Sequence, residues 1–136
     1  MNEALRRKAA IVGIGATEFS ANSGRSEQRL AAEAVLAALE DAGLTPDDVD
    51  GIVNSDFDAT NQIDVINTVG LRNIGAYATI PHGGGSPCGT VAQAAMMVAS
   101  GASRCVVAYR SLNERSGHRY GSSEAVPTFP RVYGLH

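Results

Sequence analysis

Short apolar runs alternate with segments of helical periodicity along the first 110 residues of the chain. Four such runs, rich in branched or small apolar side chains and bounded by glycine or polar residues, lie at residues 9–15, 51–54, 76–80 and 104–109. Apolar runs of this length that lack strict alternation are typical of strands buried on both faces. The pattern therefore predicts four short strands of a parallel sheet.

Between these runs, apolar residues recur at helical spacing over residues 26–43, 61–71 and 86–101. Ser26 can cap the first of these segments, and Gly43 ends it. In the third segment, Ser86 is a suitable N-cap and Pro87 falls at the first helical position, where its missing N–H costs nothing. We therefore expect three helices, of which the second has the weakest pattern.

The resulting order β-α-β-α-β-α-β predicts an α/β fold with a mainly parallel sheet and right-handed crossovers. After Arg110 the periodicity stops, and the following residues combine Ser, Gly, Pro, Arg and aromatic side chains without a repeat. Loops of this length in a compact domain are usually functional or incomplete. The chain thus divides into an α/β unit over residues 1–110 and a long loop segment over residues 111–136, which is either unfinished or in contact with a partner.

Composition narrows the class of protein. The 136 residues are 44% hydrophobic and carry a formal net charge of −3, as expected of a soluble globular domain. A negative net charge argues against nucleic acid as the main partner. Two cysteines do not form a disulfide framework in a chain of this length, and they predict thiols in a reducing cytoplasm. No apolar stretch has the length of a membrane span.

The glycine-rich turn over residues 82–90 is the strongest indication of chemistry. Capping by Ser86 would place Cys88 at the second helical position, beside unsatisfied backbone N–H groups and the positive end of the helix dipole. Such a site favours the nucleophilic thiolate, and the preceding glycines let a thioester carbonyl approach closely. The alternative is a small cysteine buried at a helix start. Cys105, in an apolar strand, is expected to be inert core.

Other chemistry is weakly indicated. Residues 13–15 lack the third glycine and the adjoining helix of a dinucleotide site. No set of His, Cys, Asp and Glu residues has metal-ligand spacing, so no metal is predicted. The candidate bases for Cys88 are His82 and His118, although His82 also suits a turn.

The element order and the cysteine turn together resemble the N-terminal half of the thiolase superfamily. Residues 88–94, Cys-Gly-Thr-Val-Ala-Gln-Ala, are similar to the nucleophile motif of thiolases, Cys-Gly-Ser-Gly-Leu-Gln-Ala, and depart from it at Thr90 and Val91. Residues 11–19 and 115–121 resemble the sterol-carrier-type branch, in particular the lipid-transfer-protein thiolase-like proteins of actinobacterial sterol catabolism.

The resemblance implies a fold of two similar halves, of which this chain covers the first part. The last strand of the first half and the whole second half, with the family's oxyanion-hole histidine, second catalytic cysteine and aldolase tyrosines, have no counterpart here. We therefore expect a fragment of a longer protein or a second half supplied from elsewhere.

The function implied by the resemblance is carbon–carbon cleavage, retro-aldol or thiolytic, on coenzyme A (CoA) thioesters in sterol or lipid side-chain degradation. The alternative is a non-catalytic acyl-CoA or lipid-binding domain, or a structural subunit of a heteromeric complex. Cys88 is the catalytic candidate. The candidate substrate-binding residues are Gly84, Gly85, Ser86, His118 and Arg119. His118 and Arg119, with Arg115, could hold a CoA phosphate or form a partner surface, or lie in a solvated loop.

No bound cofactor is expected beyond coenzyme A as part of the substrate. The expected partners are a second copy of the chain, which the family pairs through the strand at residues 76–80, and a small OB-fold or zinc-ribbon protein.

Overall fold

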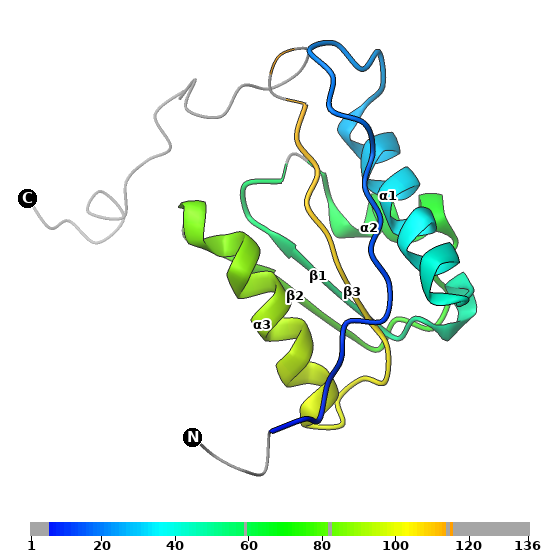
Figure 1. Cartoon of the computed structure of the whole chain (residues 1–136), viewed down its shortest axis with the longest axis vertical. Coiled ribbons are helices and arrows are strands. Elements are labelled where there is room, and N and C mark those ends of the chain that lie inside the picture. The colour runs from blue at the N-terminus through cyan, green and yellow to red at the C-terminus, as the bar shows by residue number, and fades with distance from the viewer. Residues whose placement is uncertain (1–5, 59, 82, 114, 116–136) are drawn as a thin grey trace, which may run out of the picture.

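The computed structural model describes residues 6–58, 60–81, 83–113 and 115. A parallel three-stranded sheet forms the middle layer, with helices α1 and α2 on one face and α3 on the other (Figure 1). Most of the apolar core lies between the sheet and the first two helices, where Ile52, Val65 and Val35 are almost fully buried. The predicted α/β class with a parallel sheet is confirmed.

β1 (Gly51–Ser55) is the central strand, between β2 (Ala76–Ile80) and β3 (Val106–Ala108). Gly51 pairs with Ala76 on one side and with Val106 on the other, both in parallel register. Every residue of β1 is buried because helices cover both faces. Three of the four predicted strands therefore form.

The first helix has the caps that the sequence predicts. In α1 (Glu27–Ala42), the Ser26 hydroxyl accepts a hydrogen bond from the backbone N–H of Arg29 at 3.2 Å. The helix ends at Gly43, which has the left-handed φ of 67° that suits glycine. α2 (Gln62–Val69) ends in the same way, at Gly70.

The third helix, α3 (Ser86–Ala99), follows a 3₁₀ turn over Gly83–Gly85, and a second 3₁₀ turn occupies Pro46–Asp48. The interpretation of Ser86 as N-cap was wrong. Gly85 holds the cap position, with helical φ and ψ of −82° and −16° and no side-chain cap. The glycine turn winds directly into the helix, so Ser86 is already its first residue.

The N-terminal apolar run is not a strand, contrary to prediction. Residues 9–15 lie along α1 without helix or strand (Figure 1). A Cβ on Gly13 would lie 2.2 Å from the Ala38 carbonyl oxygen, and one on Gly15 would lie 2.1 Å from that of Ala34. The backbone of the run therefore packs directly on the helix. Apolar periodicity does not distinguish this packing from sheet pairing.

A cleft of about 580 Å³ lies beside this N-terminal run. It is lined by Val12, by Val91 and Val98 of α3, and by Val106 and Ala108 of β3. The outer edge of β3 therefore faces the N-terminal run across this cleft and does not pair with it. Among the described residues, the sheet has three strands instead of the predicted four.

Asp50 fixes the turn into β3. Its carboxylate accepts hydrogen bonds of 2.9 Å from the backbone N–H groups of Arg104 and Cys105. Burial acts to raise the pKa of Asp50, but the hydrogen bonds from Cys105 and Arg104 and the charge of Arg104 outweigh it and leave the pKa below its ordinary value. The carboxylate is therefore ionised at neutral pH and holds the turn.

No helix in the described part of the chain is both long and apolar enough to cross a membrane. Of the loop segment predicted over residues 111–136, the structure describes 111–113 and 115, which are irregular. The rest of that segment lies outside the described residues, and the division of the chain at residue 110 stays a prediction.

Replacing Gly15 with alanine is expected to lower the free energy of unfolding by about 1–3 kcal/mol, because the new methyl group would overlap the helix backbone. Gly75→Ala is the matched control, since a Cβ there meets no atom within 4 Å and its φ is not in the left-handed region. Urea unfolding of both variants checks the packing of the N-terminal run. Equal midpoints would contradict it.

Candidate functional site

Polar residues gather at the carboxyl end of the sheet, where β1 and β2 end. In open α/β sheets, ligands bind at this edge. A polar hollow of about 240 Å³ lies there, lined by Asn54, Ser55, Asp56, Asp58, Thr60, Asn61, Gln62 and Thr79. These residues come from the end of β1, the following loop, the start of α2 and one position of β2.

A buried amide network forms the floor of this hollow. The Asn54 side-chain oxygen accepts hydrogen bonds from Gln62 at 2.7 Å and from the Thr79 hydroxyl at 2.9 Å. Gln62 also donates to the Ala78 carbonyl at 2.6 Å. Burial raises the pKa of the nearby Tyr109 phenol, so it stays protonated at neutral pH. The side chains of this network hydrogen-bond to one another and to the backbone. They therefore support the site and do not supply an acid or base.

Ser86, the first residue of α3, connects this helix to the end of β1 beside the amide network. Its side chain is 1% exposed, and its hydroxyl lies 2.6 Å from the fully buried hydroxyl of Ser55 at the end of β1. Gly89, one turn further, packs against β2, because an added Cβ would lie 2.8 Å from a methyl group of Ile80. The first turn of α3 is therefore held against the ends of two strands.

Cys88 is the third residue of α3, not the second, and it is exposed. Gly84 and Gly85 are exposed on the same turn, so the structure brings these three predicted site residues together. Ser86 lies beneath them, buried. The remaining candidates, His118 and Arg119, and the candidate base His82 lie outside the described residues.

Sequence reasoning missed Asp58 and Arg110. The Asp58 carboxylate is fully buried and accepts hydrogen bonds from the N–H of Ser55 at 2.9 Å, Nε of Arg110 at 2.9 Å and the N–H of Ser111 at 3.0 Å. These partners come from segments more than fifty positions apart in the chain, and no local pattern marks such a pairing.

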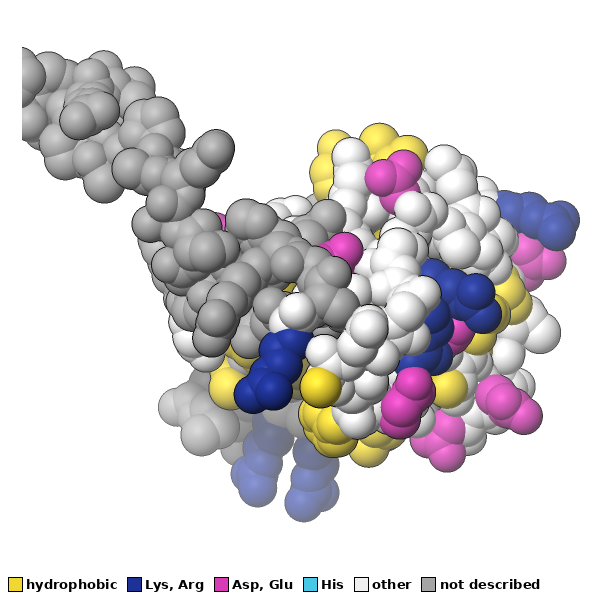
Figure 2. Space-filling model, turned by 90° about the horizontal axis from the view of Figure 1, so that it is seen from above, with side chains coloured by type: hydrophobic (Ala, Val, Ile, Leu, Met, Phe, Trp, Pro, Cys, Tyr) yellow, Lys and Arg dark blue, Asp and Glu magenta, His cyan; other side chains and the backbone are white. Residues whose placement is uncertain are grey.

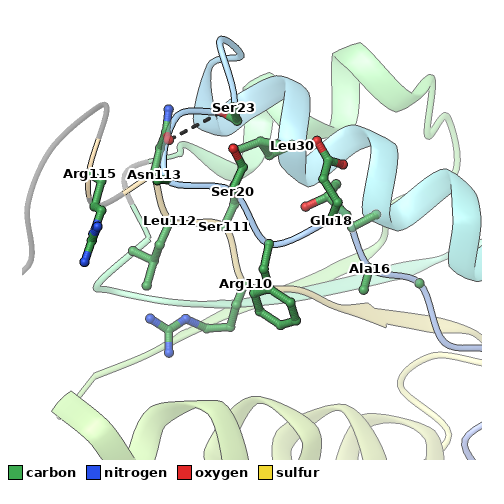
Figure 3. A pocket seen from close by; sticks show the side chains of 15 residues that line it. Ala16, Glu18, Ser20, Ser23, Leu30, Arg110, Ser111, Leu112, Asn113 and Arg115 are labelled. Carbon is green, nitrogen blue, oxygen red and sulfur yellow. Dashed lines mark hydrogen bonds between the residues drawn. The ribbon is translucent and has the colours of Figure 1, made fainter.

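Arg110 lines another cavity, of about 780 Å³, between residues 15–21 and residues 110–113 and 115 (Figure 3). We call it the arginine cleft, because Arg110 and Arg115 are its basic residues. Leu30, Ala34 and Leu112 are among its apolar lining residues.

Charge does not gather by sign on the face of the molecule that Figure 2 presents. Figure 2 shows basic and acidic side chains interspersed, with hydrophobic side chains between them, and no continuous basic face in that view. Across the described residues, no group of three or more His, Cys, Asp and Glu side chains is placed to hold a metal ion.

These elements define a partial thiolase-like α/β fold. No family model matches the chain. A solved structure of an Ltp2-ChsH2(DUF35) aldolase superposes with a TM-score of 0.83 and 51% identity, over 98% of this chain and 35% of that one. A priming β-ketosynthase of a polyketide pathway gives a TM-score of 0.53 and 28% identity, over 68% of this chain and 30% of that one.

Two curated proteins resemble the sequence. A steroid side-chain-cleaving aldolase of Thermomonospora curvata and a 17-hydroxy-3-oxo-4-pregnene-20-carboxyl-CoA lyase of Mycobacterium tuberculosis are each 56% identical over 117 residues. Each match covers 86% of this chain, and the chain spans 30% of the length of each relative.

Cys88 is expected to be alkylated faster than Cys105 at neutral pH. Cys88 is exposed, whereas burial, with the charges of Asp50 and Asp48, raises the pKa of the Cys105 thiol and reduces its reactive thiolate. Iodoacetamide labelling with peptide mass mapping measures both rates. Cys88→Ser should leave only the slow label, and preferential labelling of Cys105 would overturn the placement of the helix start.

Proposed function

We propose that this chain is the N-terminal part of a lipid-transfer-protein-type steroid side-chain aldolase, acting on a CoA thioester. The observation that carries the proposal is the extended identity to an aldolase and a CoA lyase, together with the close superposition on an aldolase of known structure. The site lies at the carboxyl end of the sheet, around the glycine turn and Cys88.

Retro-aldol cleavage is the reaction that the relatives' names favour. A base takes the proton of a hydroxyl that is β to the thioester carbonyl, and the C–O bond becomes a carbonyl. The bond between the α and β carbons breaks, and its electron pair passes to the thioester as an enolate, which is then protonated at the α carbon. Donors aimed at the developing oxyanion lower the barrier. This route makes no covalent demand on Cys88.

Thiolytic cleavage would use Cys88 differently. The thiolate would attack the β-keto carbonyl of a CoA thioester, and the bond between the α and β carbons would break. Its electron pair would leave as the thioester enolate, which is protonated at the α carbon, and the acyl group on sulfur would pass to the thiol of a second coenzyme A. That route needs a base beside the sulfur, and the candidates from the sequence, His82 and His118, lie outside the described residues. The exposed backbone of Gly84 and Gly85 suits the approach of a thioester in either reaction.

A second candidate function is a non-catalytic acyl-CoA or lipid-binding domain, or a structural subunit in a heteromer. It is favoured by the apolar side chains that α3 leaves exposed, Val91 at 47% and Met96 at 53%. Such side chains are typical of surfaces that another chain or domain covers.

The proposed partners are a second copy of the chain and a small OB-fold or zinc-ribbon protein. β2 is an edge strand of the described sheet, and its Tyr77 side chain is 75% exposed, which suits pairing across residues 76–80. The aldolase of known structure carries a second component in its name. Cytoplasmic location is part of the same proposal.

Replacing Cys88 with alanine in the complete protein, assembled with its partner, separates the two reactions. Retro-aldol chemistry is expected to keep kcat/KM close to that of the unaltered protein, whereas an acyl-enzyme route would lose about a thousandfold or more. The measurements are release of the carbonyl product from a β-hydroxy steroid CoA thioester and of the acyl product from a β-keto thioester with added coenzyme A, with Cys105→Ala as the control. Binding of the thioester without any cleavage would favour the non-catalytic function.

The purified polypeptide is expected to sediment as at least two chains at micromolar concentration. Tyr77→Lys should increase the monomer fraction, because a charge on an edge strand opposes pairing. Leu36→Lys is the control, since Leu36 is similarly apolar, is 45% exposed and lies on α1, away from β2. A compact monomer of the unaltered chain in analytical ultracentrifugation would contradict the pairing.

A further inference from the structure

The arginine cleft carries two guanidinium groups on one side. Figure 3 shows the side chains of Arg110, Leu112 and Arg115 extending to the same side of the segment that follows β3. Alternate residues of an extended segment point to the same side, so the backbone presents Arg110 and Leu112 together. A cation therefore stands next to an apolar side chain at the wall of a large open cavity.

The Arg110 guanidinium is fixed in place by a buried carboxylate. Its Nε atom donates to Asp58 at 2.9 Å, and the Asp58 side chain is wholly buried while that of Arg110 is 28% exposed. Within the described residues, Nε is the one Arg110 side-chain atom with a hydrogen-bond partner. With respect to the described residues, the two terminal amino groups are thus available to a ligand, in the planar fork that matches phosphate oxygens.

The segment that carries Arg110 is itself clamped. The Ser111 N–H donates to Asp58 at 3.0 Å, and its hydroxyl donates to the Glu27 carbonyl at the start of α1, at 2.5 Å. Asn113 donates to the Arg25 carbonyl at 2.8 Å. The guanidinium is therefore held before a ligand arrives, which lowers the entropic cost of binding.

Glu18, the one acidic residue among the described residues that line the cleft, does not compete for Arg110. Glu18 forms an ion pair with Arg25, which also pairs with Glu33. Asp58 engages one side of the Arg110 guanidinium only, and Arg115 adds a second positive charge to the lining. The ligand that fits this arrangement has an anionic group with several oxygens and a less polar portion that can lie along Leu112 and Leu30.

We propose that the arginine cleft binds a phosphate of the coenzyme A portion of the substrate, with Arg110 as the binding residue and Asp58 as its positioning residue. The proposal rests on the proposed function for its ligand. Asp58 also accepts the Ser55 N–H, and the Ser55 hydroxyl contacts Ser86 at the start of α3. One chain of hydrogen bonds therefore joins the anion site to the glycine turn at which the thioester would react.

The test compares two thioesters of the same acyl group in the complete protein with its partner, one of coenzyme A and one of pantetheine, which has no phosphate. Arg110→Gln is expected to raise KM for the CoA thioester about tenfold or more with kcat little changed. KM for the pantetheine thioester should stay the same. Arg72→Gln is the control, because Arg72 is 78% exposed and lies outside the cleft.

Asp58→Asn tests the positioning role. It keeps the side-chain shape but removes the charge that orients the guanidinium, so KM for the CoA thioester should rise and its dependence on salt should increase. Arg110→Lys, which keeps the positive charge without the planar fork, should give an intermediate rise. Equal losses with both thioesters, or none with either, would overturn the proposal.

Direct binding separates this proposal from the proposed function. If the complete protein cleaves no steroid CoA thioester, calorimetric titration with free coenzyme A still tests the cleft. A dissociation constant about tenfold weaker for Arg110→Gln than for Arg72→Gln supports it. Identical affinities of the two variants would overturn it whatever the reaction proves to be.

Discussion

Burial of β1 on both faces is the constraint on which the rest of the fold depends. Side chains of a strand alternate between faces, so Ile52 packs toward α1 and α2 while Gly51 and Val53 face α3. At Gly51, a Cβ would lie 2.8 Å from the Ser103 hydroxyl and 2.9 Å from a methyl group of Val106. The central strand has no solvent-facing side on which polar groups could be hydrated.

That constraint dictates what happens where β1 ends. The chain must leave the core, and polar groups at its end need partners because an unsatisfied buried group costs about 1–3 kcal/mol. Ser55 obtains one from Ser86, and the Asp58 carboxylate obtains its own from Arg110 and two backbone N–H groups. The hydrogen bonds that these groups form at the end of β1 therefore position both the start of α3 and the wall of the arginine cleft.

Local signals account for the parts of the structure that the sequence predicts. The caps at Ser26 and Gly43 and the apolar runs at 51–54 and 76–80 depend on neighbours in the chain, and they form where expected. Residues 9–15 carry the same apolar pattern but pack on a helix backbone. An apolar pattern indicates that a segment is buried, but it does not indicate which element the segment packs against. Ser86 likewise has a capping residue type, yet the glycine turn before it already holds helical dihedral angles.

The candidate site also has parts that the sequence predicts from local signals and parts that depend on long-range packing. Proximity of Gly84, Gly85 and Cys88 follows from their place on one turn, so the sequence predicts it. The Asp58–Arg110 pair joins residues 52 positions apart, and its formation depends on β1 and β3 lying side by side. Only the assembled sheet brings those two side chains within reach.

The close approach of Gly13 and Gly15 to α1 also sets a register. If the N-terminal run slid along the helix by one residue, Val12 and Ile14 would meet the carbonyl oxygens of α1, which lie just over 2 Å from where a Cβ would stand on each glycine. A slide of two residues toward the C-terminus would put the side chain of Ile11 in the position of Gly13. The two missing side chains therefore permit a single alignment. Steric exclusion specifies it together with one hydrogen bond, which the Ile14 N–H donates to the Asp41 carboxylate of α1 at 2.8 Å.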